Sequence, residues 1–263
     1  MTRRHLVFEC EGSLLVGTLD DGADQTGLLI VTGGNEVRSG AFAGQAELAA
    51  RISARGFPVF RFARLGIGDQ EGPNGEFTSS SRDIAAALAE FQAQCPHMTR
   101  TVGLGNCDGA SALMLNGGAG LDGLLLSNPW TFEGSDSASE APPEAVREHY
   151  RRRLADPAAI KRLLTGQVSI GKLVRSLKDA VRPAPPPSGL AQDMARGMRV
   201  FTGSAVFLIA ENDRTGQAFL SGWDKSDPRI RSCPGASHGY VEPHARQWLA
   251  GQVLEMLDML EAQ

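Results

Sequence analysis

Thr-Val-Gly-Leu-Gly-Asn-Cys-Asp-Gly, at residues 101–109, is a short apolar strand that runs directly into a turn of the form G-x-C-x-G. Glycines two positions before and two positions after Cys107 let a strand and a helix approach each other closely on either side of a strained turn. Residues 110–115 are typical of the start of a helix, whose first free N–H groups would face whatever the sulfur attacks. The stretch predicts a cysteine nucleophile at position 107; the alternative is a buried structural cysteine in a turn.

The pattern around this turn alternates between apolar strands and amphipathic helices. The run at residues 27–32 is almost continuously apolar, as in strands that are buried on both faces of a parallel sheet. Ahead of it, residues 5–10 and 14–19 read as a hairpin. Further strands are predicted at residues 58–62, 101–104, 123–127, 205–210 and 230–233, and helices at residues 42–55, 83–94, 107–116 and 242–259. The alternation predicts an α/β fold with a mostly parallel, doubly wound sheet.

One long segment interrupts this alternation. After residue 130 come an acidic, serine-rich stretch, helical patterns at 143–164 and 170–181, and a proline-rich run. The length of 263 residues suits one large domain with an insertion better than two full domains. We interpret residues 131–203 as an inserted helical cap, with residues 1–130 and 204–263 forming the core.

Composition limits the classes of function. With 26 basic and 30 acidic residues, the net charge of −4 favours neither nucleic acid nor a membrane surface as a partner. The four cysteines show no C-x-x-C spacing, which excludes the common zinc and dithiol patterns and does not resemble a secreted disulfide framework. The N-terminus turns polar too early for a signal peptide, and no run is long enough to span a membrane. We expect a cytoplasmic protein that needs no metal or cofactor.

Two further residues follow predicted strands in the order nucleophile, acid, base. Asp213 comes just after the strand that ends at residue 210, and His238 comes after the last strand. An imidazole beside Cys107 would take or share the thiol proton, and a carboxylate on its other nitrogen would fix its tautomer and stabilise its charged form. Asp213 is the preferred acid and Glu211 the second candidate. The alternatives are a histidine in a plain turn and an aspartate that only caps the next helix.

A covalent mechanism of this kind also needs N–H groups that stabilise an anionic oxygen. One donor is expected from the backbone of Asp108, the residue after the nucleophile, and a second from the glycine-rich loop after residue 32. In that loop Gly34 and Asn35 are preferred over Gly33 as donors, and the sequence does not choose between them. A plain turn is the alternative reading of the loop.

Several stretches together carry a resemblance to a known family. They are residues 31–34 with Arg38 and Gly40, 61–62, 66–72, 105–108, 127–130 and, most specifically, 149–154 with 163–166. With these stretches the chain resembles the exosortase A system-associated hydrolase 1 family over nearly its whole length. The resemblance implies an α/β-hydrolase fold in which Cys107, Asp213 and His238 are nucleophile, acid and base, with Asp108 beside the nucleophile.

The chain departs from this family pattern at places that line or support the expected pocket. Ala63-Arg64-Leu65 stands where the family has Asp-Tyr-Arg, Asn35 replaces a proline, and Gly239-Tyr240 replaces a bulkier pair. These changes leave the predicted catalytic residues in place, but they alter the pocket, so the substrate of the family is not expected to carry over to this chain. Arg38 and Trp130 are the candidate substrate-binding residues, and interior packing is an equally good reading of Trp130.

A cysteine nucleophile forms a thioester acyl-enzyme, which amines and alcohols intercept as well as water. The sequence therefore predicts an acyl hydrolase or acyltransferase of the thioesterase or esterase type. Residues 147–182 hold ten basic and three acidic residues, which suit the phosphates of coenzyme A or an acidic acyl carrier protein, or form a solvated helix face. The alternative function is a binding protein that keeps the fold without turnover; intact Asp213 and His238 argue against it.

Overall fold

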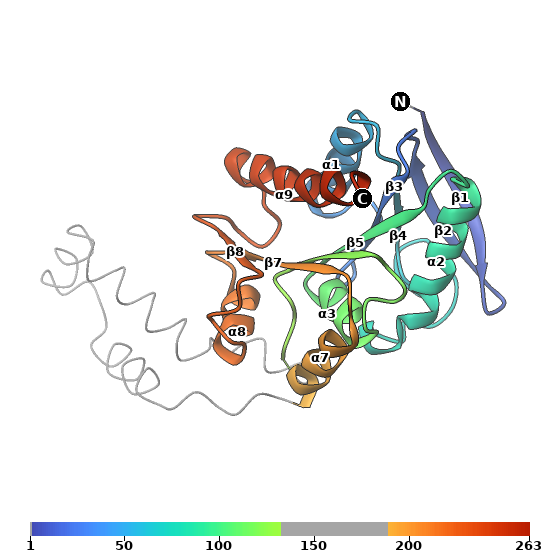
Figure 1. The fold of residues 1–263 in the computed structure, drawn as a ribbon. Coiled ribbons are helices and arrows are strands. Elements are labelled where there is room, and N and C mark those ends of the chain that lie inside the picture. Colours follow the sequence, from blue (N-terminus) through green and yellow to red (C-terminus); the bar gives the residue numbers. More distant parts are fainter. Residues whose placement is uncertain (1, 133–188) are drawn as a thin grey trace, which may run out of the picture.

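The computed structural model describes residues 2–132 and 189–263, and within them the chain forms one eight-stranded sheet (Figure 1). The strand order is β1-β2-β4-β3-β5-β6-β7-β8. The first pairings, β1 with β2 and β2 with β4, are antiparallel, and all the others are parallel. The strands are β1 (Arg3–Cys10), β2 (Ser13–Asp20), β3 (Thr26–Val31), β4 (Val59–Phe62), β5 (Arg100–Asn106), β6 (Gly123–Ser127), β7 (Ser204–Ala210) and β8 (Ile230–Cys233).

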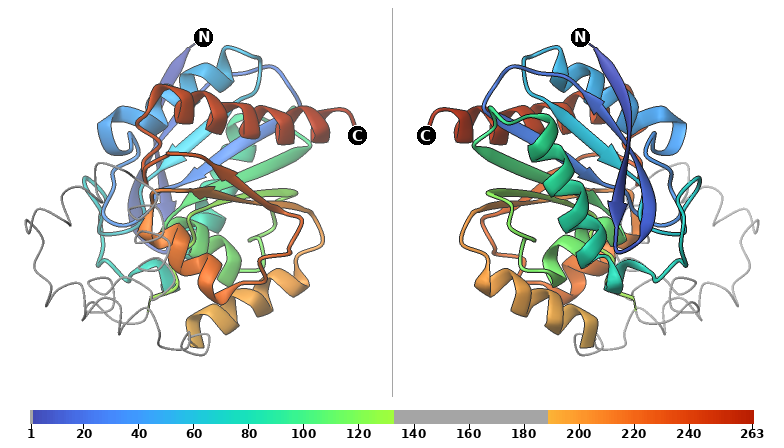
Figure 2. Two further views of the ribbon diagram at one scale, coloured as in Figure 1. Left: turned by 90° about the vertical axis from the view of Figure 1, so that its left-hand side faces the viewer. Right: turned by 90° about the vertical axis from the view of Figure 1, so that its right-hand side faces the viewer.

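Helices cover both faces of the sheet and bury two hydrophobic clusters (Figures 1 and 2). On one face lie α1 (Gly44–Ser53) and α9 (Pro243–Glu261), and on the other lie α2 (Ser81–Gln94), α3 (Asp108–Leu115), α7 (Gly189–Val200) and α8 (Arg214–Gly222). Strands β3 and β4 supply alternate residues to the two clusters, as the period of two in a strand requires. The predicted α/β fold with a mostly parallel sheet is confirmed.

Helices α7 and α8 are not among the predicted elements, and two of the predicted helices begin one or two residues later than expected. The helix predicted from residue 42 begins at Gly44, because Phe42 and Ala43 adopt left-handed backbone conformations in a short 3-10 turn, Ala41–Ala43. The helix predicted from Cys107 begins at Asp108 for a similar reason, since Cys107 has φ 58°. Both starts depend on backbone conformations that few non-glycine residues adopt, and helical periodicity does not report them.

The last part of the predicted insertion packs against the core of the domain. Helix α7 lies inside the segment 131–203, and its Met194 and Met198 are buried in the larger hydrophobic cluster. The helical patterns predicted at 143–164 and 170–181, and the basic segment 147–182, lie outside the described residues.

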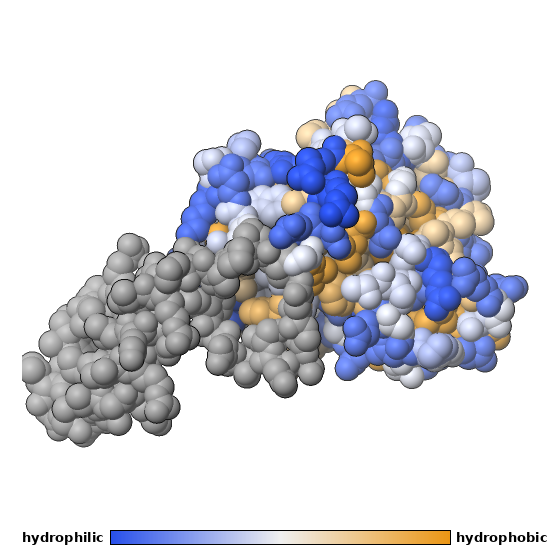
Figure 3. All heavy atoms as spheres, turned by 90° about the horizontal axis from the view of Figure 1, so that it is seen from below, coloured by the Kyte–Doolittle hydropathy of each residue, from blue (hydrophilic) through white to orange (hydrophobic). Residues whose placement is uncertain are grey.

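The described surface carries both polar and apolar residues. Seen from below, a hydrophobic band near the centre is bordered by hydrophilic residues (Figure 3). Exposed large apolar side chains include Phe42, in the turn before α1, and Val200, at the end of α7. Scattered exposed apolar side chains are normal on soluble domains, so we attach no site to them.

The close crossing of α7 and α3 gives a prediction about stability. A Cβ at Gly197 would collide with the carbonyl oxygen of Met114 on α3, so Gly197→Ala is expected to lower the free energy of unfolding by about 1–3 kcal/mol. Gly251 lies exposed inside α9 with no atom near its Cβ position. Gly251→Ala is therefore expected to raise the same free energy by about 0.5–1 kcal/mol. Urea denaturation of both variants checks this, and a Gly197→Ala protein as stable as the wild type would contradict the close crossing.

Candidate active site

The site is built on the strained turn between β5 and α3. Cys107 has φ 58° and ψ −128°, and its amide donates to the carbonyl of Ser127 on β6 at 2.9 Å. A Cβ at Gly105 would meet the backbone of Gly109 and Ala110, and a Cβ at Gly109 would meet the carbonyl oxygen of Val31. The two glycines therefore permit the close approach that the motif predicted. The turn leaves Cys107 partly exposed at the carboxyl edge of the sheet.

His238 and Asp213 lie on loops at the same edge and contact each other. His238 Nδ1 is 3.0 Å from Asp213 Oδ2, and the aspartate is 7% exposed. The same oxygen accepts the amide of Gly216 at 2.9 Å, so Asp213 also caps α8. Glu211, the second candidate acid, instead accepts the backbone amide of Gly235. The arrangement thus combines the two sequence readings of Asp213, because capping holds the carboxylate beside the imidazole.

The charge on His238 follows from its neighbours. Burial alone would lower the pKa of His238, but hydrogen bonds to Asp213 and Cys107, together with the charges of both, outweigh burial and raise the pKa to about 10. The ring is therefore protonated at neutral pH, which is the form that pairs with a thiolate.

Two asparagines that the sequence analysis did not single out connect the base to the sheet. The amide of Ala210 donates to Asn128 Oδ1 at 2.8 Å, and Asn128 Nδ2 donates to Asn106 Oδ1 at 3.2 Å. Asn106 Nδ2 then lies 3.4 Å from both the carbonyl oxygen and Nε2 of His238. The contact with Nε2 needs an unprotonated nitrogen, whereas the contact with the carbonyl holds in both charge states. A backbone N–H of β7 thereby orients both amides and the loop of His238.

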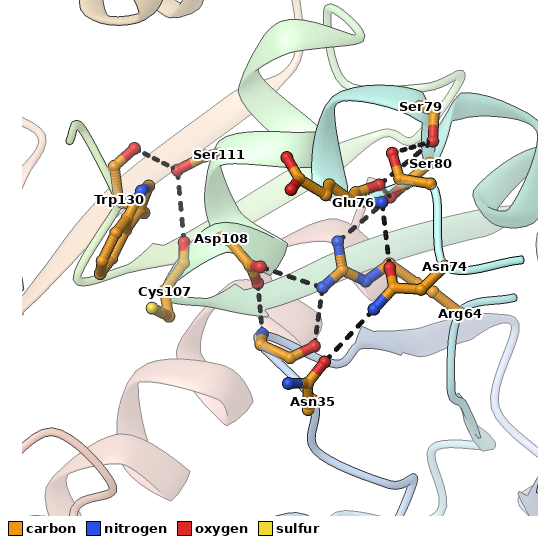
Figure 4. Close-up of polar contacts among 12 residues, drawn as sticks. Asn35, Arg64, Asn74, Glu76, Ser79, Ser80, Cys107, Asp108, Ser111 and Trp130 are labelled. Carbon is orange, nitrogen blue, oxygen red and sulfur yellow. Dashed lines mark hydrogen bonds and ion pairs between the residues drawn. The ribbon is translucent and has the colours of Figure 1, made fainter. Parts of the chain in front are cut away.

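The expected oxyanion donors lie beside Cys107, and one of them is already engaged (Figure 4). The amide of Gly34 donates to Asp108 Oδ1 at 2.5 Å. Arg64 lies behind the pair, and its Nη2 is 3.0 Å from both Asp108 Oδ2 and the carbonyl oxygen of Gly34. Asn35, the other candidate, accepts a hydrogen bond on its side-chain oxygen from Asn74 at 3.3 Å. The Asp108 carboxylate therefore already accepts the Gly34 amide, which is one of the two loop donors that the sequence predicts for an oxyanion.

Arg64 is a functional candidate that the sequence analysis noted only as a departure from a family pattern. Its side chain is 4% exposed, and Nη1 donates to Ser80 Oγ at 3.2 Å. A buried guanidinium beside the first residue of α3 adds positive charge next to the position where an oxyanion would form. A run of three residues, Ala63-Arg64-Leu65, contains no signal for this role, because the contact depends on how two distant loops meet.

The two candidate substrate-binding residues have different positions. Trp130 follows β6, and its amide lies 3.3 Å from the carbonyl oxygen of Cys107, while its ring packs edge-on against Phe132 at 4.8 Å between centroids. Ser111 Oγ bridges the carbonyls of Cys107 and Trp130 (Figure 4). Arg38, in contrast, pairs with Asp69 and lines a separate cavity to which Cys107 does not contribute. The structure therefore brings Trp130, and not Arg38, to the site.

A cavity of about 90 Å³ lies behind the site, between α1 and α9. Its wall includes Asn106, next to the nucleophile, and Gly239, next to the base, together with a mixture of apolar and charged side chains. Glu36 is one of the charged residues that line it, and burial raises the pKa of this carboxyl. The volume is below that of a benzene-sized cavity of about 150 Å³, so only a small group fits it.

The part of the chain that the structure describes contains no cluster of three His, Cys, Asp or Glu residues suited to a metal ion. None of the described helices is long and apolar enough to cross a membrane.

The sequence matches the model of the alpha/beta hydrolase family over residues 28–252. The chain belongs to the alpha/beta hydrolase family. This match spans β3 to α9, and with them the turn at Cys107 and the loops of Asp213 and His238. No protein of curated function matches the sequence.

Solved structures of similar fold include an esterase of Pyrococcus furiosus, at 14% identity and a TM-score of 0.63, over 98% of this chain and 91% of that one. A lidless α/β serine hydrolase of Xanthomonas campestris has 14% identity and a TM-score of 0.59, over 99% and 95%. The thioesterase domain of the curacin biosynthetic pathway has 13% identity and a TM-score of 0.55, over 97% and 100%. At such identities these similarities establish the alpha/beta hydrolase fold alone, and they do not identify the reaction or the substrate.

Proposed function

We propose that this alpha/beta hydrolase is an acyl hydrolase or acyltransferase that cleaves esters or thioesters through a covalent acyl-enzyme on Cys107. The observation that carries the proposal is the 3.0 Å contact of His238 with the buried Asp213, beside a cysteine held in a left-handed turn. A protonated imidazole next to a cysteine supports a thiolate nucleophile. The esterases and thioesterases of similar fold are consistent with this chemistry.

In the first half-reaction the thiolate of Cys107 attacks the carbonyl carbon, and the bond from this carbon to the leaving oxygen or sulfur breaks. His238 donates its Nε2 proton to the leaving alkoxide or thiolate, so the ring becomes neutral. Asp213 holds Nδ1–H throughout and fixes the tautomer. The products are a thioester on Cys107 and a free alcohol or thiol.

In the second half-reaction neutral His238 takes a proton from water, an alcohol or an amine as that molecule attacks the thioester carbonyl. The bond from carbon to the Cys107 sulfur breaks, and the sulfur leaves as thiolate beside the restored imidazolium. The contact of Asn106 Nδ2 with Nε2 is compatible with this neutral intermediate form. Water as acceptor gives hydrolysis, and an alcohol or amine gives acyl transfer.

The oxyanion of both steps requires N–H donors near the carbonyl oxygen. We place the backbone amide of Asp108 first among them, because it begins α3 directly after the nucleophile. Gly34 joins it only when the Asp108 side chain releases the Gly34 amide, and Asn35 offers the neighbouring amide of the same loop. Release of Gly34 would leave Arg64 as a compensating positive charge close by.

We extend the proposal to the carrier of the acyl group. The basic segment 147–182, with ten basic and three acidic residues, suits coenzyme A phosphates or an acidic acyl carrier protein. We also propose that the chain is a member of the exosortase A system-associated hydrolase 1 family, on the basis of the sequence stretches quoted above. Neither extension is needed for the chemistry at Cys107.

Intact mass spectrometry tests the function directly. After brief incubation with coenzyme A thioesters, neutral N-acetylcysteamine thioesters and activated esters, we expect wild-type protein to gain the mass of one acyl group, and Cys107→Ala to gain none. Faster acylation by the coenzyme A thioester than by its neutral analogue would support the anionic carrier. If no adduct and no turnover were seen across the panel, the binding-protein alternative would replace the enzyme.

A further inference from the structure

A group of polar residues shares one face of the sheet at the edge formed by β1, β2 and β4. His5 pairs in register with Thr18, and Thr18 with Arg61, while Arg3 pairs with Asp20. Because alternate residues of a strand point to opposite faces and paired residues to the same face, these five side chains lie together. Residues on the opposite face of the same strands, among them Phe8, Leu15, Leu19 and Phe60, pack into the larger hydrophobic cluster.

Four of these residues, all but the buried Asp20, line an open cavity of about 470 Å³, which we call the arginine cavity. Its wall consists of Arg3, His5 and Thr18 from the β1–β2 hairpin, Arg61 from β4, Ala46 from α1, and Val37, Arg38, Ser39 and Asp69 from loops. One water occupies about 30 Å³ in the liquid, so the cavity has room for a polyatomic ion with its hydration. Cys107, His238 and Asp213 do not line it.

The charges of the arginine cavity do not balance. Asp20 is fully buried and is shared by two arginines, with Arg3 Nε at 2.6 Å and Arg61 Nη2 at 3.2 Å. Asp69 is more than half exposed and binds Arg38 Nη1 at 2.7 Å. Three guanidinium groups therefore face two carboxylates, and one of these carboxylates is open to solvent. The surplus is positive, and beside it lie Ser39 and Thr18, whose hydroxyl accepts Arg38 Nε at 3.1 Å.

Arg61 shows that this surplus is built into the fold. The residue is 2% exposed, and its Nη1 donates to the carbonyl oxygen of Arg38 at 2.6 Å. Its Nε is buried without a hydrogen-bond partner. A buried guanidinium with an unmatched N–H is costly unless an acceptor meets it, so the arrangement suits an anion in the adjoining cavity.

We propose that the arginine cavity binds a phosphate group, as a site separate from Cys107 and independent of the function proposed above. Arg3 and Arg61, fixed by Asp20, supply the rigid positive wall, and Arg38 turns from Asp69 to the phosphate oxygens. Guanidinium groups match phosphate geometry with paired hydrogen bonds, and a phosphate carries more charge than the single carboxylate it displaces. Inorganic phosphate and a phosphate monoester are the two sources of such a group.

The test is a titration of ¹⁵N-labelled wild-type protein with inorganic phosphate at constant ionic strength, followed by amide chemical shifts. We expect saturable shifts at Val37, Arg38, Ser39 and Ala46. Arg38→Gln should weaken binding about tenfold, because it removes a charged donor. Asp69→Asn should tighten binding severalfold, because it removes the carboxylate that competes for Arg38.

A matched ion pair at the far edge of the sheet serves as the control. Arg231 on β8 and Glu255 on α9 are 2.6 Å apart, and Arg231→Gln and Glu255→Gln make the same changes of net charge. These two variants should bind phosphate as the wild type does. No saturable shift, or equal effects of the two pairs of variants, would overturn the proposal. A parallel titration with glycerol 3-phosphate separates the two sources, since tighter binding than inorganic phosphate indicates an esterified ligand and weaker binding a free one.

Discussion

Replacing His238 by glutamine is expected to slow the alkylation of Cys107 by iodoacetamide at pH 6 by roughly 100-fold. An ordinary thiol that ionises near pH 8.5 is only about 0.3% thiolate at this pH. In the wild type, the contacts with Asp213 and Cys107 raise the pKa of His238 to about 10, so the ring stays protonated and its charge stabilises the thiolate. Glutamine keeps a polar side chain but carries no charge. The second-order rate constant, followed by mass, measures the effect.

The alkylation rates of the wild type and of His238→Gln should also depend differently on pH. Because His238 remains an imidazolium up to about pH 10, its charge favours the thiolate of Cys107, and the wild type should react faster than His238→Gln between pH 6 and 8, with the largest difference at pH 6. The rate of His238→Gln should rise about tenfold per pH unit until the ordinary thiol range is reached. A wild-type rate at pH 6 that is equal to the variant's would contradict an ion pair at the site.

The other cysteines provide an internal control. Burial raises the pKa of Cys95 to about 11, and it also raises the pKa of Cys10 and Cys233, with nearby carboxylates adding to the shift. All three are buried, so they should remain unmodified at pH 6. A single added mass that is absent from Cys107→Ala assigns the reaction to the turn between β5 and α3.

Much of this architecture can be predicted from the periodicity of apolar residues and from the positions of glycines in turns. The apolar run at β3 and the glycines around Cys107 mark a parallel sheet with a sharp strand-to-helix turn, because both features are local in sequence. The order of Asp213 and His238 after later strands is also visible, since parallel strands end at one edge. Because both loops lie at that edge, a contact between the two side chains is expected, and His238 Nδ1 lies 3.0 Å from Asp213 Oδ2.

The residues that the sequence did not reveal act through contacts between distant loops. Asn128 is fully buried and connects β7 to Asn106, but as a single residue after β6 it carries no periodic signal. Arg38 shows the opposite case, because the sequence placed it at the site and the structure does not. It shares a loop with Gly34, yet its side chain turns to Thr18 and Asp69, away from the nucleophile. The direction of a loop side chain is decided by the partners that tertiary packing supplies.

Asp108→Ala is expected to lower the free energy of unfolding by roughly 3 kcal/mol, because it leaves a buried guanidinium without its carboxylate. Arg64 is 4% exposed, its Nε has no partner, and Asp108 Oδ2 is 3.0 Å from its Nη2 (Figure 4). Arg64→Met should cost less, since Asp108 is 16% exposed and keeps the Gly34 amide. The double variant should be more stable than the sum of the single effects predicts, by about 1–3 kcal/mol.

Urea denaturation of the four proteins measures this coupling, and additive effects would show that the pair contributes no stability through its contact.

The same variants separate the two roles of Asp108. Its side chain occupies the Gly34 amide, whereas its own backbone N–H remains in every variant. If Gly34 completes the oxyanion hole, folded Asp108→Ala should acylate Cys107 at least as fast as the wild type, because the competing carboxylate is gone. A slower reaction at equal folded fraction would instead assign the Asp108 carboxylate, held by Arg64, to the positioning of the Gly34 loop around the substrate.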